Sequence, residues 1–116
     1  MLALDPELLS NQAGGDAELV TELLELFGET LPDMVGNIED KMASGDAPGV
    51  ARAAHLLKGS AGNMGARTLM DAASGLEGAA RASDRSTMAF WWGRLREEAK
   101  RVQAAVDVLL AEGATP

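Results

Sequence analysis

The chain has 116 residues, of which 47% are hydrophobic and 24% charged, and it carries a net charge of −8. This length fits a single domain over residues 1–116, and the composition is that of an ordinary globular protein. The acidity disfavours nucleic acid and anionic membranes as partners, and the absence of cysteine excludes disulfides and thiolate metal sites.

Two helices are predicted in the first third of the chain. Asp5 and Pro6 have the signature of a helix start and predict a short helix from about Pro6 to Gln12. Asp16 can cap a second helix over about 16–43, in which apolar residues recur at helical spacing. Pro32 lies inside this helix and predicts a kink near residues 28–32.

Three further helices are expected, over about 47–64, 66–82 and 84–111. In the last of them Trp91 and Trp92 are adjacent, so we expect one ring to fill the core and the other to lie near the surface. Residues 112–116 are expected to fray.

The fold is predicted to be all-α, because no segment has the alternation or hairpin turns of a sheet. Short links between the long helices favour an up-and-down antiparallel four-helix bundle, with the short N-terminal helix as a lid over one end. The first residues have no basic region or sustained apolar run, so neither a signal peptide nor a membrane span is expected and a cytoplasmic location is favoured.

The third helix contains His55, the only histidine of the chain. On a helical wheel His55 lies about 140° from the predicted core line, and Gly59 and Gly62 share its outward face. The core line is formed by Val50, Ala54, Leu57, Ala61 and Met64.

The residues around His55 suit an anion in transit. A glycine costs about 1 kcal/mol relative to alanine inside a helix, and Gly59 is best explained as space for a bulky group or a partner. Gly62 has the same explanation, or else allows close helix packing. Lys58 offers a mobile cation for a phosphoryl oxygen. Leu56 belongs either to an apolar docking patch or to a partly buried contact with a neighbouring helix.

Histidine is suited to phosphoryl transfer, because its neutral imidazole is nucleophilic near physiological pH and the phosphoramidate that it forms is labile. Nucleophilicity at one ring nitrogen improves when the other donates its proton to an acceptor. Glu77 on the fourth helix is the candidate acceptor.

The segment from His55 to Gly65 reads His-Leu-Leu-Lys-Gly-Ser-Ala-Gly-Asn-Met-Gly and closely resembles the histidine phosphotransfer (HPt) domain family of multistep phosphorelays. The resemblance extends over most of the chain. It includes Asp16-x-Glu18-Leu19, Gly45-Asp46, Ala54 and Leu76-Glu77.

The resemblance implies that His55 is phosphorylated, that Lys58 neutralises phosphate and that Gly59 leaves space for the partner's active site. It places Glu77 where some members use glutamine to bond the imidazole. Arg81 aligns with a basic position of some members, from which it could offset repulsion between Glu77 and the phosphoryl group.

The function that the resemblance implies is relay of a phosphoryl group between receiver-domain aspartates, or from a hybrid or other histidine kinase to a response regulator. The chain would be a monomeric stoichiometric carrier without independent catalysis, cofactor or metal, and any magnesium would belong to the receiver. The alternatives are a non-phosphorylated docking or regulatory module for a receiver or kinase, and a piece excised from a larger kinase.

Overall fold

The computed structural model describes residues 3–112, which contain five α-helices. They are α1 (Pro6–Gln12), α2 (Ala17–Ala43), α3 (Ala47–Asn63), α4 (Arg67–Arg81) and α5 (Arg85–Ala111). No strand occurs within residues 3–112, so the predicted all-α class is confirmed. Fraying was expected for residues 112–116, of which residues 113–116 lie outside the described part of the chain.

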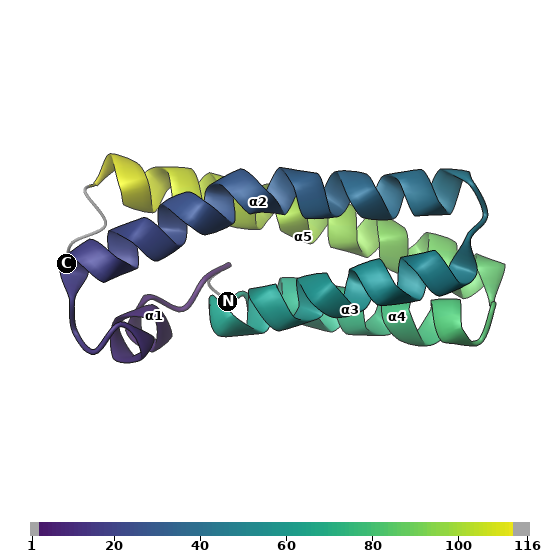
Figure 1. Ribbon diagram of the computed structural model, residues 1–116, viewed down its shortest axis with the longest axis horizontal. Coiled ribbons are helices and arrows are strands. Elements are labelled where there is room, and N and C mark those ends of the chain that lie inside the picture. Colours follow the sequence, from purple (N-terminus) through teal and green to yellow (C-terminus); the bar gives the residue numbers. More distant parts are fainter. Residues whose placement is uncertain (1–2, 113–116) are drawn as a thin grey trace.

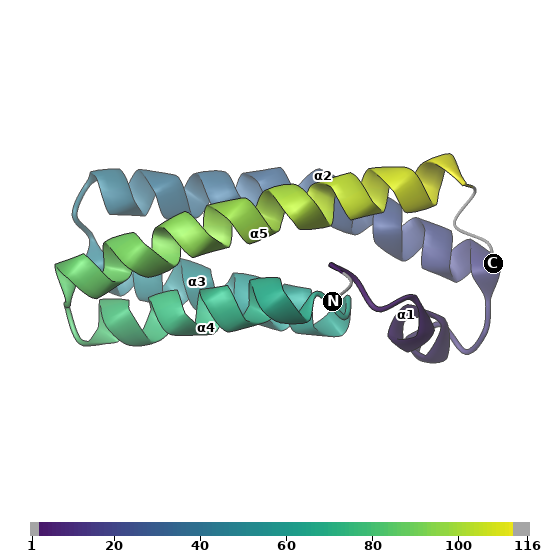
Figure 2. The same ribbon diagram turned by 180° about the vertical axis from the view of Figure 1, so that it is seen from behind.

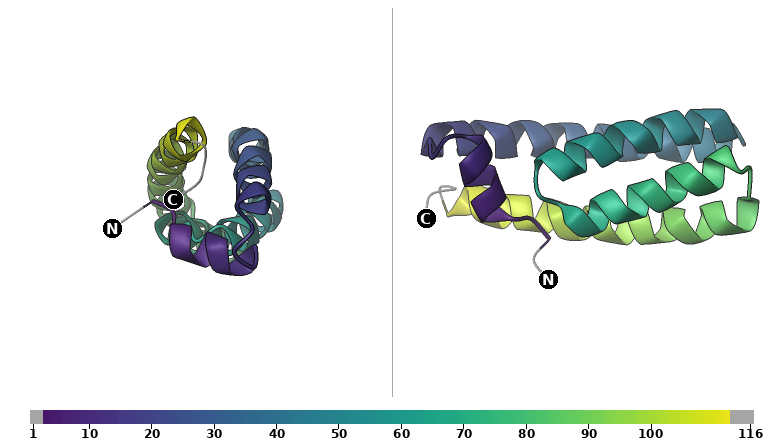
Figure 3. Two further views of the ribbon diagram at one scale, coloured as in Figure 1. Left: turned by 90° about the vertical axis from the view of Figure 1, so that its left-hand side faces the viewer. Right: turned by 90° about the horizontal axis from the view of Figure 1, so that it is seen from below.

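The long helices form an elongated body with extents of 43 × 20 × 19 Å. In Figures 1 and 2 the chain runs along the long axis in α2, returns in α3, runs out again in α4 and returns in α5. Figure 3 shows α1 lying crosswise at one end, beside the beginning of α2. No helix within the described residues is long and apolar enough to span a lipid bilayer.

Aspartate side chains begin four of the five helices. Each accepts a hydrogen bond from at least one backbone N–H of the first turn, which would otherwise lack a partner. These caps are Asp5, Asp16, Asp46 and Asp84. The exception is α4, whose N-cap Ala66 makes no side-chain hydrogen bond.

The long helix α2 continues through Pro32 without interruption. Proline has no N–H to donate to the carbonyl of residue 28, and its ring crowds that carbonyl, so the helix is expected to bend there. Figure 1 shows α2 changing direction part-way along its length. Gly28 lies opposite α5, where an added Cβ would meet Val106 Cγ1 at 3.2 Å.

Small side chains bring α3 and α4 close together. More than half of the buried residues in each helix are alanine, and such positions allow two helix backbones to approach closely. The five residues expected on the core line of α3 are all buried. This packing fixes the face of α3 that carries His55 against the edge of α4 that carries Glu77.

The prediction for the two tryptophans was wrong, because neither ring is fully buried. Their side chains lie about 100° apart on α5 and straddle the buried line through Leu95. Trp91 covers Gly75 of α4, where an added Cβ would overlap the indole ring. Trp92 lies beneath the guanidinium of Arg96, which is 5.8 Å from the ring centroid.

Candidate functional site

His55 lies on the outer face of α3, with 59% of its side chain exposed. Its helical neighbours Ala54 and Leu57 are completely buried, so the core holds the backbone while the imidazole stands outside it. The predicted outward orientation is therefore confirmed.

Glu77 lies beside the imidazole, as predicted for the acceptor on the fourth helix. Its Oε2 is 3.0 Å from His55 Nδ1. A carboxylate can only accept, so this contact selects the tautomer in which Nδ1 carries the proton. The lone pair of the neutral ring is then on Nε2, which Glu77 does not contact.

Two cations also bind the Glu77 carboxylate, although the side chain is 91% buried. Lys58 Nζ donates to Oε1 at 2.7 Å, and Arg81 donates to Oε2 from Nη2 at 2.7 Å and from Nε at 3.1 Å. The sequence predicted both cations near the site, but not that Lys58 would be held by the carboxylate. Together Lys58, Arg81 and Glu77 carry one net positive charge. The negative charge of Glu77 is therefore more than balanced before any phosphoryl group arrives.

Hydrogen bonding from Lys58, and then from Arg81, lowers the pKa of Glu77 from 4.5 to about 2. Burial acts in the opposite direction by disfavouring the charged form, and the hydrogen bond from His55 adds a smaller downward contribution. Glu77 is consequently ionised throughout the neutral range and remains an acceptor for His55.

The depressed pKa predicts a pH-dependent contribution to stability. A carboxylate whose pKa is lower in the folded state stabilises the fold above its unfolded pKa of 4.5, and this contribution is lost as the pH falls through about 2. Because Lys58 and Arg81 expose 32% and 63% of their side chains, solvent screens the interaction, and we expect about 1–2 kcal/mol.

Urea unfolding of the native protein and of Glu77→Gln between pH 2 and pH 6 measures this contribution. The free energy of unfolding should fall more steeply with acid in the native protein than in the variant. Equal slopes for the two proteins would show that the carboxylate is not stabilised by its neighbours.

The two glycines on the outward face of α3 have different surroundings. An added Cβ at Gly59 would meet nothing within 4 Å, as its predicted role as open space requires. At Gly62 a Cβ would lie 3.1 Å from Met70 Sδ, which favours the close-packing explanation for this residue. Gly78, which follows Glu77 on α4, is also open and was missed, although a mid-helix glycine is the same kind of signal.

Leu56 is 66% exposed, so the alternative of partial burial against a neighbouring helix is excluded. An apolar side chain that the fold leaves in water next to His55 is available to a docking partner.

Charge is unevenly distributed over the helices. Four basic and only two acidic side chains lie on α3 and α4, whereas α2 has seven acidic side chains and one basic. The basic residues are Arg52, Lys58, Arg67 and Arg81. The two helices that form the site are therefore positive on an acidic chain, which attracts a negatively charged group toward His55. Within residues 3–112, no three histidine or acidic side chains gather as a metal site.

Comparisons with known proteins agree with this geometry. The family model described as Hpt domain matches residues 22–105. The HPT domain of the Hpt sensor hybrid histidine kinase from Shewanella has a TM-score of 0.82 and 22% identity, over 95% of each chain. Histidine-containing phosphotransfer protein B (HptB) from Pseudomonas aeruginosa PAO1 has a TM-score of 0.83 and 23% identity, over 90% of this chain and 91% of that one. A search of curated protein sequences found no significant match.

Proposed function

Because this chain belongs to the Hpt domain family of phosphotransfer modules in two-component signalling, we propose that it carries a phosphoryl group on His55 between receiver-domain aspartates. A histidine kinase is the alternative donor. The observation that carries this proposal is an exposed imidazole whose Nδ1 is bound to the ionised Glu77, which leaves Nε2 directed away from that bond.

The proposed transfer begins when the lone pair of His55 Nε2 attacks the phosphorus of a receiver's aspartyl phosphate. The nitrogen–phosphorus bond forms as the bond from phosphorus to the carboxyl oxygen breaks, and this oxygen keeps the electron pair as a carboxylate. No proton has to leave the ring, because the attacking nitrogen has none. Donation to a second receiver is the reverse reaction with another aspartate.

The phosphorylated ring is positively charged, since Nδ1 keeps its proton while Nε2 is bonded to phosphorus. Glu77 lies 3.0 Å from Nδ1 and stabilises this charge, as a carboxylate does for a catalytic imidazolium. Repulsion between Glu77 and the phosphoryl oxygens is offset by Lys58 and Arg81, which already bind the carboxylate.

Lys58 is proposed to turn from Glu77 toward a phosphoryl oxygen as the group arrives. Its Nζ donates to a single acceptor among the described residues, Glu77 Oε1, so only one hydrogen bond is given up when it turns. Arg81 can remain on Glu77 Oε2 and keep the carboxylate neutralised meanwhile.

The chain acts as a monomeric, cytoplasmic, stoichiometric carrier in an up-and-down antiparallel four-helix bundle, and it has no catalysis or cofactor of its own. Any magnesium is bound by the receiver. The net positive charge of α3 and α4 supports a partner that presents a phosphorylated aspartate.

We expect Lys58→Gln to slow phosphoryl transfer from a receiver about tenfold, because a charge-assisted hydrogen bond to the phosphoryl group is lost. Lys100→Gln is the matched control, since Lys100 also pairs with a glutamate but lies on α5, 3.6 Å from Glu97 and with 69% of its side chain exposed. Transfer of ³²P from a labelled receiver measures both rates. Equal rates for the two variants would remove Lys58 from the transfer step.

The proposed function is tested by incubating the protein with phosphorylated receiver domains and following label onto His55. Label on the protein that is acid-labile and alkali-stable, as a phosphoramidate is, supports the proposal. Binding of a receiver without any transfer would contradict it and would leave a docking role.

A further inference from the structure

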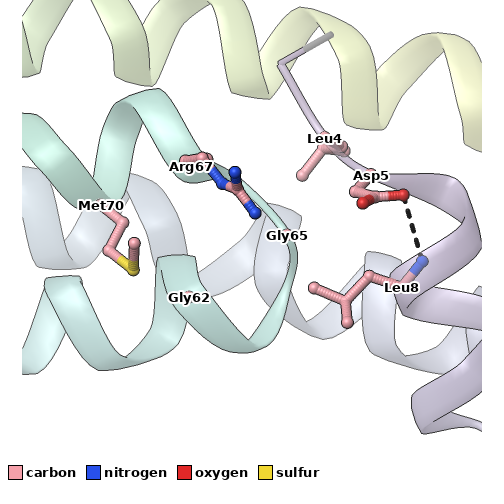
Figure 4. Close-up of a pocket in the computed structure, with 7 residues that line it drawn as sticks. All are labelled: Leu4, Asp5, Leu8, Gly62, Gly65, Arg67 and Met70. Carbon is pink, nitrogen blue, oxygen red and sulfur yellow. Dashed lines mark hydrogen bonds between the residues drawn. The ribbon is translucent and has the colours of Figure 1, made fainter.

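A pocket of about 390 Å³ lies between α1 and the turn from α3 to α4. Figure 4 shows residues of the N-terminal segment on one side of it and residues of α3, α4 and their turn on the other. The lining is formed by Leu4, Asp5, Leu8, Gly62, Gly65, Arg67 and Met70. Its volume is within the usual range for pockets that bind small molecules.

The pocket lies two helical turns from the proposed phosphotransfer site along both α3 and α4. Gly62 follows His55 by seven residues on α3, and Met70 precedes Glu77 by seven on α4. Seven residues are two helical turns, about 10 Å, and they keep a residue on the same face. Because α3 and α4 run in opposite directions, both shifts lead toward the turn between them, so the pocket continues the face that carries His55.

A protein that reaches His55 also reaches this pocket. A specific interface buries about 800 Å² on each partner, which corresponds to a patch with a radius of about 16 Å. A patch of that size centred on His55 extends past a point about 10 Å away. The near wall of the pocket, at Gly62 and Met70, therefore lies within reach of a partner that docks on His55.

The lining has apolar walls and one unengaged cation. Leu4 is buried, and Leu8 and Met70 are half-buried. Asp5 uses its Oδ1 to accept from the backbone N–H groups of Glu7 and Leu8. Arg67 has no hydrogen bond or ion pair among residues 3–112, so its guanidinium is available to a carboxylate from outside.

We propose that this pocket receives an apolar side chain, flanked by a carboxylate, of the receiver domain that exchanges the phosphoryl group with His55. The inference rests on the proposed function and adds to it a second contact point. The site at His55 performs the transfer, while the pocket, three of whose seven lining residues come from the N-terminal segment, selects which receiver docks.

Arg67→Glu tests the charged part of this contact. Arg67 is exposed at the first position of α4, where an acidic residue is favourable to the helix, so the variant should fold. We expect kcat/KM for transfer from a receiver to fall about tenfold, because like charges then face each other. Arg94→Glu, an equal charge change at an exposed position of α5, should alter it less than twofold.

Leu8→Ser tests the apolar part, with Val108→Ser on α5 as its control, since Val108 is 57% exposed and does not line the pocket. The same drop in kcat/KM is expected for Leu8→Ser alone. Labelling of His55 by phosphoramidate, a donor too small to reach the pocket, separates docking from chemistry and should be equal in all four variants.

The results distinguish the two proposals. Pocket variants that match their controls in transfer from every receiver overturn the docking pocket and leave the function of His55 intact. Slower labelling by phosphoramidate in Arg67→Glu would likewise overturn it, because the effect would then arise at His55. If no receiver labels the native protein, both proposals fail.

Discussion

His55→Gln takes up no phosphoryl group from a phosphorylated receiver, whereas the native protein is labelled. This complete loss follows because the variant has no nucleophilic nitrogen, and His55 is the only histidine of the chain. Glutamine keeps an N–H that can donate to Glu77, so the charged cluster can persist. Label is measured as acid-labile ³²P on the protein after separation from the receiver.

As a control, the thermal stability and the receiver binding of His55→Gln are compared with those of the native protein. Because the imidazole is 59% exposed, its removal should leave the thermal midpoint within a few degrees of the native value. Binding to the receiver should also be retained. Label that persists on His55→Gln would place the phosphoryl group on another residue and would contradict the proposed function.

Gly59→Leu is expected to slow transfer from a receiver about a hundredfold while leaving the protein folded. The position faces open space one turn from His55, so a leucine side chain projects where the partner must approach. A mismatched docking surface of this kind costs about 3 kcal/mol, which corresponds to the stated factor. The rate is measured with labelled receiver as before.

Gly93→Leu is the matched substitution, since Gly93 is also a helical glycine facing open space, on α5. Both variants should gain about 0.5–1 kcal/mol in stability from the better helix former. Only Gly59→Leu should lose transfer. If the two variants transferred equally well, the bare strip beside His55 would have no role in access.

Helix starts and the direction of side chains were the features most open to prediction. Asp5 and Asp16 were predicted at helix starts, and both cap helices by local hydrogen bonds, which can be predicted from neighbouring residues. The outward position of His55 follows from helical periodicity alone. Glu77 could be named as its partner from the chemistry that an imidazole needs.

Features that depend on how two helices meet could not be predicted. A helical wheel gives the direction of Lys58 but not the distance from its Nζ to Glu77, which depends on the close packing of α3 and α4. For the same reason the alternatives for Gly62 stayed open until Met70 was located, and the half-buried tryptophans were assigned wrongly. The pocket beside α1 joins segments far apart in sequence and gave no sequence signal.

In the proposed transfer, phosphorus bonds to Nε2 of His55 while Nδ1 keeps its proton and donates it to Glu77 in a hydrogen bond. Nitrogen–phosphorus coupling in the NMR spectrum of the ¹⁵N-labelled, phosphorylated protein identifies the bonded nitrogen directly. We predict coupling to Nε2 and a protonated Nδ1. Coupling to Nδ1, or a phosphorylated protein with no phosphorus on His55, would contradict transfer through Nε2.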